Sequence, residues 1–167
     1  MIRPTIFFLF FLCLNLLTRA QTKLQVEEKI THLLTTNIDA KEIKDSIALY
    51  TFSIKISLKK TKGKAMVDEI SWNDPMANLI FKDINILKQV DYKVFLLNKS
   101  KTDIIIPVAY IVANYKTNDI GEKKISIIGL QESLYKLFNC TSQKNCMNDN
   151  INYLRPMIIT VDKAIYD

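Results

Sequence analysis

Residues with reactive or proton-transferring side chains are few and lie far apart in the sequence. The chain of 167 residues has one histidine, His32, and three cysteines. His32 falls roughly 120° away from the apolar stripe of a predicted helix, so we expect it at the surface, outside any catalytic or metal site. Four carboxylates are candidates for an acid–base pair: Asp68, Glu69, Asp74 and Asp83. Surface placement and helix capping account for them more simply.

The common catalytic motifs are missing from the sequence. It contains no His-Glu-x-x-His, no Gly-x-Ser-x-Gly and no Walker loop for phosphates. A cysteine nucleophile needs a basic partner, and the two cysteines that follow the N-terminal segment are expected to pair with each other. The sequence therefore predicts a protein that is not an enzyme and uses no cofactor.

Cys140 and Cys146 are separated by five polar or charged residues. In an oxidising compartment such a pair is usually bridged, and closing this loop would stabilise the fold by about 2 kcal/mol on the chain-entropy model. A zinc site needs further ligands, and His32 is distant in sequence. We therefore predict a disulfide between Cys140 and Cys146, and no metal.

The N-terminus has the pattern of a secretory signal. Residues 6–17 read IFFLFFLCLNLL, which is shorter than the roughly 20 apolar residues of a membrane-spanning helix. Thr18 and Ala20 suit the small-residue positions before a cleavage site. We expect cleavage after Ala20, a secreted or periplasmic location and no stable membrane span afterwards. The alternatives are an uncleaved anchor or a lipid on Cys13, which the bulky Leu12 disfavours.

The charge pattern points away from nucleic acids. The formal net charge is +6, and removal of residues 1–20 takes away two arginines and lowers it to +4. Arg155 is then the only arginine, whereas bidentate recognition of phosphates and guanine relies on arginine. We therefore expect no nucleic-acid partner, and a weak attraction to anionic surfaces of the cell envelope.

The first part of the mature chain predicts a helix and then a hairpin. A capping-box pattern at Thr22 and apolar residues at helical spacing predict a helix, and a short helical turn is expected at residues 40–44. Residues 52–58 alternate between apolar and polar, as in a strand with one buried face. The lysine-rich turn at 59–64 leads to a partner strand at 65–72. We interpret this turn as a solvated loop that protects a sheet edge, with an anion-binding tip as the alternative.

The second part of the chain predicts two helices and two strands. Asp74 and Pro75 should begin a helix that runs to about residue 88. A nearly all-apolar strand is expected at 104–113, and its Pro107 favours an edge position because proline has no N–H to donate to a ladder. A short helix is expected at 130–139 and a strand-like segment at 151–161.

This order of elements resembles the C-terminal domain of TonB-type energy-transducing proteins over about residues 24–113. Three segments carry the resemblance: 50–58, the Lys62-Gly63-Lys64 turn with the strand after it, and 103–112. The resemblance implies an α+β fold, an antiparallel sheet with a lysine-rich hairpin packed against two or three helices. Residues 92–94 depart from the Trp-x-Pro-like segment of the family, and a Pro-rich spacer is lacking. The expected organisation is a signal peptide at 1–20 and a single domain at 21–167, with a disulfide-bearing extension at 114–167.

Two functions follow from these features. TonB-like domains bind partner segments by strand addition, which predicts a non-catalytic envelope domain that binds an extended segment at a sheet edge. The expected contact residues are Asp103, Ile105, Pro107, Ala109, Tyr110 and Ile111. The alternative is a small periplasmic carrier of an apolar ligand or lipid, with Trp72, Phe81 and Tyr110 lining its pocket.

Overall fold

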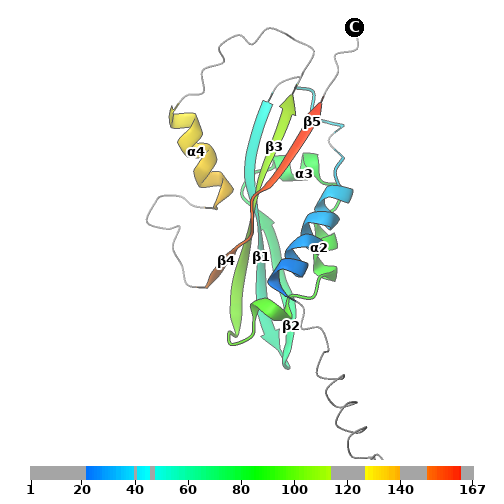
Figure 1. The fold of residues 1–167 in the computed structure, drawn as a ribbon, viewed down its shortest axis with the longest axis vertical. Coiled ribbons are helices and arrows are strands. Elements are labelled where there is room, and N and C mark those ends of the chain that lie inside the picture. Colours follow the sequence, from blue (N-terminus) through cyan, green and yellow to red (C-terminus); the bar gives the residue numbers. More distant parts are fainter. Residues whose placement is uncertain (1–21, 40, 46–47, 114–126, 140–149, 163–167) are drawn as a thin grey trace, which may run out of the picture.

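A computed structural model describes residues 22–39, 41–45, 48–113, 127–139 and 150–162 (Figure 1). The fold is α+β, with a mixed sheet of five strands. The strand order is β2-β1-β3-β4. Strand β5 pairs with the second half of β3, on the same side of β3 as β4. The elements in chain order are α2 (Lys23–Thr36), β1 (Ala48–Thr61), β2 (Lys64–Trp72), α3 (Met76–Ile80), η1 (Ile84–Gln89), η2 (Lys93–Phe95), β3 (Lys101–Ala113), α4 (Ile127–Leu137), β4 (Ile151–Tyr153) and β5 (Met157–Asp162).

Helix α2 begins where the capping box predicts. Thr22 accepts a hydrogen bond from the Gln25 N–H, and the Gln25 side chain accepts one from the Thr22 N–H. Three apolar side chains at helical spacing are buried against the sheet: Val26, Ile30 and Leu34. His32 is exposed, as expected.

The hairpin of β1 and β2 is also as predicted, and longer. Phe52, Ile54, Ile56 and Leu58 are all buried on one face of β1. The two-residue turn has positive φ at both Lys62 (51°) and Gly63 (79°), which is the type I′ geometry that matches the twist of paired strands. The alternating pattern therefore sets both the register and the buried face of this hairpin.

The predicted helix from Asp74 to about residue 88 is broken in the structure. Helix α3 ends at Ile80, and Phe81 takes an extended conformation and bridges Ile38. The Asn37 side chain makes two hydrogen bonds to the Asp83 backbone. Its Nδ2 donates to the Asp83 C=O at 2.6 Å, and its Oδ1 accepts from the Asp83 N–H at 3.1 Å. These contacts hold the chain extended, so the helix cannot continue. The predicted helical turn at 40–44 is not helical in its described part, where residues 41 and 42 form a turn and residues 43 and 44 have no regular structure.

Strand β3 lies inside the sheet, so the predicted edge position is wrong. It pairs antiparallel with β1 along Lys101–Val112, and parallel with β4 and β5 on its other side. Along β3, pairing with β4 stops at Ile105 and pairing with β5 starts at Val108, so Pro107 lies opposite the break between these two strands. Its missing N–H points into this break, so no ladder hydrogen bond is lost. The sheet is consequently mixed instead of antiparallel.

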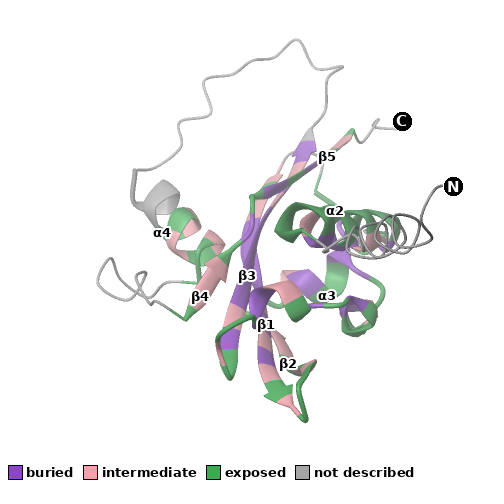
Figure 2. Cartoon of the chain, turned by 60° about the horizontal axis from the view of Figure 1, so that its bottom comes forward, coloured by how far each residue is buried: buried purple, intermediate pink, exposed green. Residues whose placement is uncertain are grey.

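Helices cover both faces of the sheet. Helices α2 and α3 lie over the face that carries Phe52 and Ile54, and α4 lies over the opposite face, nearest β1 and β3 (Figure 1). Burial is concentrated on β1, β3 and the inner sides of α2 and α3 (Figure 2). The predicted signal peptide, and Cys140 and Cys146 with their predicted disulfide, lie outside the described residues.

Candidate functional site

The two strands of the hairpin end at different levels. Strand β1 extends back to Ala48, whereas pairing with β2 reaches only to Ile54, opposite Trp72. After Trp72 the chain turns away from the sheet through Asn73 and into α3. In the described part of the chain, no strand pairs with residues 48–53 of β1 on the side away from β3.

Asn73 marks the end of this ladder. Its side-chain Oδ1 accepts a hydrogen bond from the Ser53 N–H at 2.8 Å, and its own N–H donates to the Ser53 C=O at 3.3 Å. The polar backbone groups of Ser53 therefore point to the β2 side. Because this direction alternates along an antiparallel strand, the N–H and C=O groups of Leu49 and Thr51 point to the same, unpaired side.

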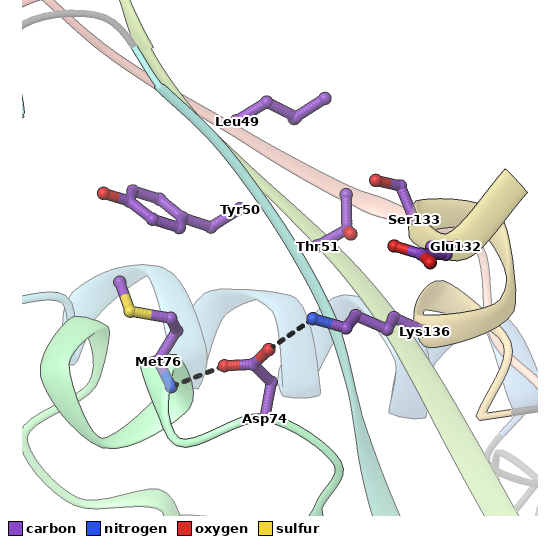
Figure 3. A pocket seen from close by; sticks show the side chains of 8 residues that line it. All are labelled: Leu49, Tyr50, Thr51, Asp74, Met76, Glu132, Ser133 and Lys136. Atoms are coloured by element: carbon purple, nitrogen blue, oxygen red, sulfur yellow. Dashed lines mark hydrogen bonds and ion pairs between the residues drawn. The ribbon is translucent and has the colours of Figure 1, made fainter. Parts of the chain in front are cut away.

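A cavity of about 130 Å³ adjoins this unpaired segment (Figure 3). We call it the β1 cavity. It lies between the loop that leads into α3 and the helix α4. Its lining residues come from three parts of the chain: Leu49, Tyr50, Thr51, Asp74, Met76, Glu132, Ser133 and Lys136.

An ion pair joins the two sides of the β1 cavity. Lys136 Nζ on α4 lies 2.9 Å from Asp74 Oδ2, and the Met76 N–H donates to Asp74 Oδ1 at 3.0 Å (Figure 3). Partial burial acts to raise the pKa of Asp74, but the Met76 hydrogen bond and the Lys136 ammonium outweigh it and hold that pKa below its usual range. Asp74 is therefore ionised near neutral pH. The Asn73 Nδ2 also donates to the Lys136 C=O at 2.7 Å, so this loop fixes the last turn of α4.

Tyr50 turns the other way from its neighbours on β1. Its hydroxyl donates to Asp45, and this hydrogen bond, together with burial, raises the pKa of Tyr50 to about 12. Its ring lies 6.5 Å from that of Tyr110 in the core. The phenol thus stays protonated near neutral pH and serves to hold the start of β1.

The residues predicted to contact a partner do not form an exposed edge. They all lie on β3, which pairs with β1 on one side and with β4 and β5 on the other, with a break only at Ile106 and Pro107: Asp103, Ile105, Pro107, Ala109, Tyr110 and Ile111. The Asp103 N–H donates to the Asn150 C=O, and the Ile105 C=O accepts from Leu154. An incoming strand has no free backbone to pair with there, so this surface for strand addition is excluded.

The aromatic residues suggested as lining for a carrier pocket are mostly packed in the core. Phe81 and Tyr110 are buried, and the Phe81 ring packs edge-to-face on Phe52 at 6.2 Å. Trp72 is partly exposed at the end of β2. A second cavity, of about 330 Å³, lies between the start of α2 and β4 and is lined by Lys23, Glu27, Phe95, Ile151, Asn152, Tyr153 and Leu154. Neither cavity is lined by the three aromatic residues.

Two further features of the described residues bear on function. They contain no group of three or more histidine, cysteine or acidic side chains placed to hold a metal ion. None of the helices in the described ranges is long and apolar enough to cross a membrane.

No family model matches the chain, and no curated protein or solved structure is similar to it. A functional assignment therefore rests on the geometry of the chain itself.

The sequence contains a signal for the unpaired half of β1, in the lengths of the two hairpin strands. Counting back from the Lys62-Gly63 turn, a partner strand that ends at Trp72 reaches only to about residue 54. The alternation of residues 52–58 starts before this point, and Thr51 and Tyr50 continue it further back. The difference in length predicts an unpaired stretch of backbone. The contribution of α4 to the cavity carries no comparable signal.

Proposed function

We propose that the protein is an exported, non-catalytic interaction domain that binds an extended segment of a cell-envelope protein by strand addition. The proposed contact is the unpaired half of β1 at Leu49 and Thr51. The partner segment would continue the line of β2 along β1 and place one side chain in the β1 cavity. The resemblance to TonB-type domains is part of this proposal.

The observation that supports it most is the combination of unpaired backbone with an adjoining cavity. Main-chain hydrogen bonds give affinity in strand addition, and pockets for alternate side chains give selectivity. At Leu49 and Thr51 two N–H and two C=O groups are directed to one side. The β1 cavity, at about 130 Å³, has room for one side chain.

The outer edge of β2 is a poorer candidate, because it is protected against pairing. Its register with β1 shifts between Ser57 and Leu58, where Asp68 is the extra residue of a β-bulge. Asp68 and Glu69 are both exposed there. Bulges and charges on an edge strand are common devices against strand addition.

The proposal is tested by removing one donor from the unpaired edge. Peptides of twelve random residues are selected for binding to the immobilised mature protein, and the affinity of the best binder is measured with Leu49→Pro. Proline removes the N–H of residue 49, which points away from β3, so the β1–β3 ladder keeps all its hydrogen bonds. Loss of a hydrogen bond worth about 1 kcal/mol, with added blockage by the proline ring, should weaken binding at least fivefold.

Leu49→Ala is the matched control, because it shortens the same side chain and keeps the N–H. Because Leu49 also lines the β1 cavity, some loss of affinity is expected, but it should be smaller than that of Leu49→Pro. Circular dichroism should show the same fold for both variants. Equal loss of affinity in the two variants would mean that the side chain, not the backbone edge, makes the contact. Unchanged affinity in both would place the binding surface elsewhere.

A further inference from the structure

The pairing of strands gathers lysines at one end of the sheet. The tip of the hairpin, residues 59–64, carries four of them. The start of β3 lies beside this tip, since the Lys60 N–H donates to the Ser100 C=O at 2.8 Å. Figure 1 shows the hairpin tip and the first residues of β3 at the same end of the molecule. We call this set the basic end: Lys59, Lys60, Lys62, Lys64, Lys99 and Lys101.

The basic end has a high density of positive charge. Residues 59–68 and 98–101 hold six lysines and one aspartate, a net charge of +5, whereas residues 21–167 as a whole carry +4. That aspartate, Asp68, forms an ion pair with Lys59. Among the described residues Lys60, Lys62, Lys64 and Lys101 are exposed and make no ion pair.

Two of these lysines face each other directly. Lys59 and Lys101 are opposite residues on neighbouring strands, an arrangement that is destabilising for like charges. The pKa of Asp68 is lowered by its hydrogen bond to Lys59 and by the charges of Lys59 and Lys101, so this carboxylate lies close to both. One carboxylate thus offsets part of a repulsion that the fold retains.

Exposed apolar side chains accompany the lysines. Leu97, in the turn before β3, is 65% exposed, and Met66, opposite Lys59 on β2, is 49% exposed. Lysines around exposed apolar side chains are typical of surfaces that bind anionic bilayers, where the charges attract the headgroups and the apolar groups enter the interface. Recognition of nucleic acid would favour arginine, and the basic end has none.

We infer that the basic end binds the surface of a membrane rich in anionic lipid headgroups. In this arrangement the long axis of the hairpin points at the bilayer, and Leu97 and Met66 reach the headgroup region. The start of β1 lies at the opposite end of the strand, thirteen residues from Thr61, so the β1 cavity would stay accessible. The inference does not depend on partner binding at that cavity.

The test is co-sedimentation of the mature protein with vesicles of phosphatidylcholine containing about 30% phosphatidylglycerol, at low ionic strength. We expect binding to these vesicles, little binding to pure phosphatidylcholine, and loss of most binding in 0.5 M salt because exposed charges are then screened. Each lysine near an anionic surface contributes a factor of about five to partitioning. The triple variant Lys60→Gln, Lys62→Gln, Lys64→Gln should therefore bind about a hundredfold more weakly.

A matched control removes two exposed lysines from the other end of β1. The double variant Lys41→Gln, Lys44→Gln also lowers the net charge. It should weaken vesicle binding by less than about twofold per lysine removed. The inference is wrong if the triple variant and this control bind alike, or if anionic and neutral vesicles bind equally. Binding to heparin or DNA without binding to the anionic vesicles would also contradict it and indicate a soluble polyanion. Retained far-ultraviolet circular dichroism excludes unfolding as the cause.

Discussion

Asn73 joins three parts of the candidate site, and its truncation should destabilise the fold. The side chain accepts from the buried Ser53 N–H at 2.8 Å and donates to the Lys136 C=O at 2.7 Å. Asn73→Ala removes both hydrogen bonds while leaving the backbone contact between Asn73 and Ser53 in place. The variant therefore isolates the amide that ends the β1–β2 ladder and holds α4 beside it.

The expected loss follows from the burial of the two partners. Ser53 is 1% exposed, and leaving a buried donor unpaired costs about 1–3 kcal/mol. Lys136 is exposed, so water can replace the lost donor there and that bond contributes about 0.5 kcal/mol. We expect the free energy of unfolding to fall by about 2 kcal/mol. With a urea m-value of about 2 kcal/mol/M, the midpoint should fall by about 1 M.

Urea unfolding followed by circular dichroism measures this change, and Asn78→Ala is the matched control. Asn78 is exposed on α3, and no hydrogen bond of its side chain is found among the described residues. Alanine also favours a helix, so this variant should be neutral or slightly stabilising. A loss below about 0.5 kcal/mol for Asn73→Ala would refute the role given to its amide.

Two further predictions concern tyrosines. Tyr92→Phe removes a buried hydroxyl that donates to the Leu87 C=O at 2.9 Å, and it should lower the free energy of unfolding by about 1 kcal/mol. The Tyr110 hydroxyl is buried and has no hydrogen-bond partner in the described part of the chain, so Tyr110→Phe should be neutral or stabilising. Equal effects of the two variants in urea unfolding would contradict this contrast. The raised pKa of Tyr50, about 12 against 10.0 when unfolded, means that the folded chain keeps this proton after the unfolded chain has lost it. The free energy of unfolding should therefore fall between about pH 10 and pH 12. The fall should be shallower in Tyr50→Phe. Identical pH profiles of the two proteins would be inconsistent with the Tyr50–Asp45 contact.

Local sequence patterns determine the parts of the fold that were predicted correctly. The capping box at Thr22 and the alternation at residues 52–58 depend on neighbours within a few residues, and both appear in the structure as expected. The Lys62-Gly63 turn is equally local, because its positive φ values suit glycine and the hairpin twist.

The parts that were predicted wrongly depend on contacts between distant residues. The break after α3 comes from Asn37, which lies 46 residues before Asp83 and bonds to its backbone. The interior position of Pro107 depends on where β4 stops and β5 starts, about 50 residues later. A proline at a break between two strands and a proline at an edge have the same sequence signature.

The candidate site was only partly within reach of the sequence. The position of the turn and the end of β2 determine how many residues of β1 are unpaired, so the unpaired stretch of β1 could have been predicted from the sequence. The double role of Asn73, which ends the ladder and also holds α4, could not be predicted from the sequence. It depends on Lys136 lying beside Asn73 in the fold. Tertiary placement of α4 therefore decides whether an open edge also has a cavity.

Amide hydrogen exchange of the mature protein with and without a selected peptide tests the central claim most directly. Strand addition at the open half of β1 predicts slower exchange of the Leu49 and Thr51 N–H groups on peptide binding, because both would become hydrogen-bonded. The N–H groups along β5 and the outer edge of β2 should exchange as before. Protection along β5 or β2 with no change at Leu49 and Thr51 would contradict the claim.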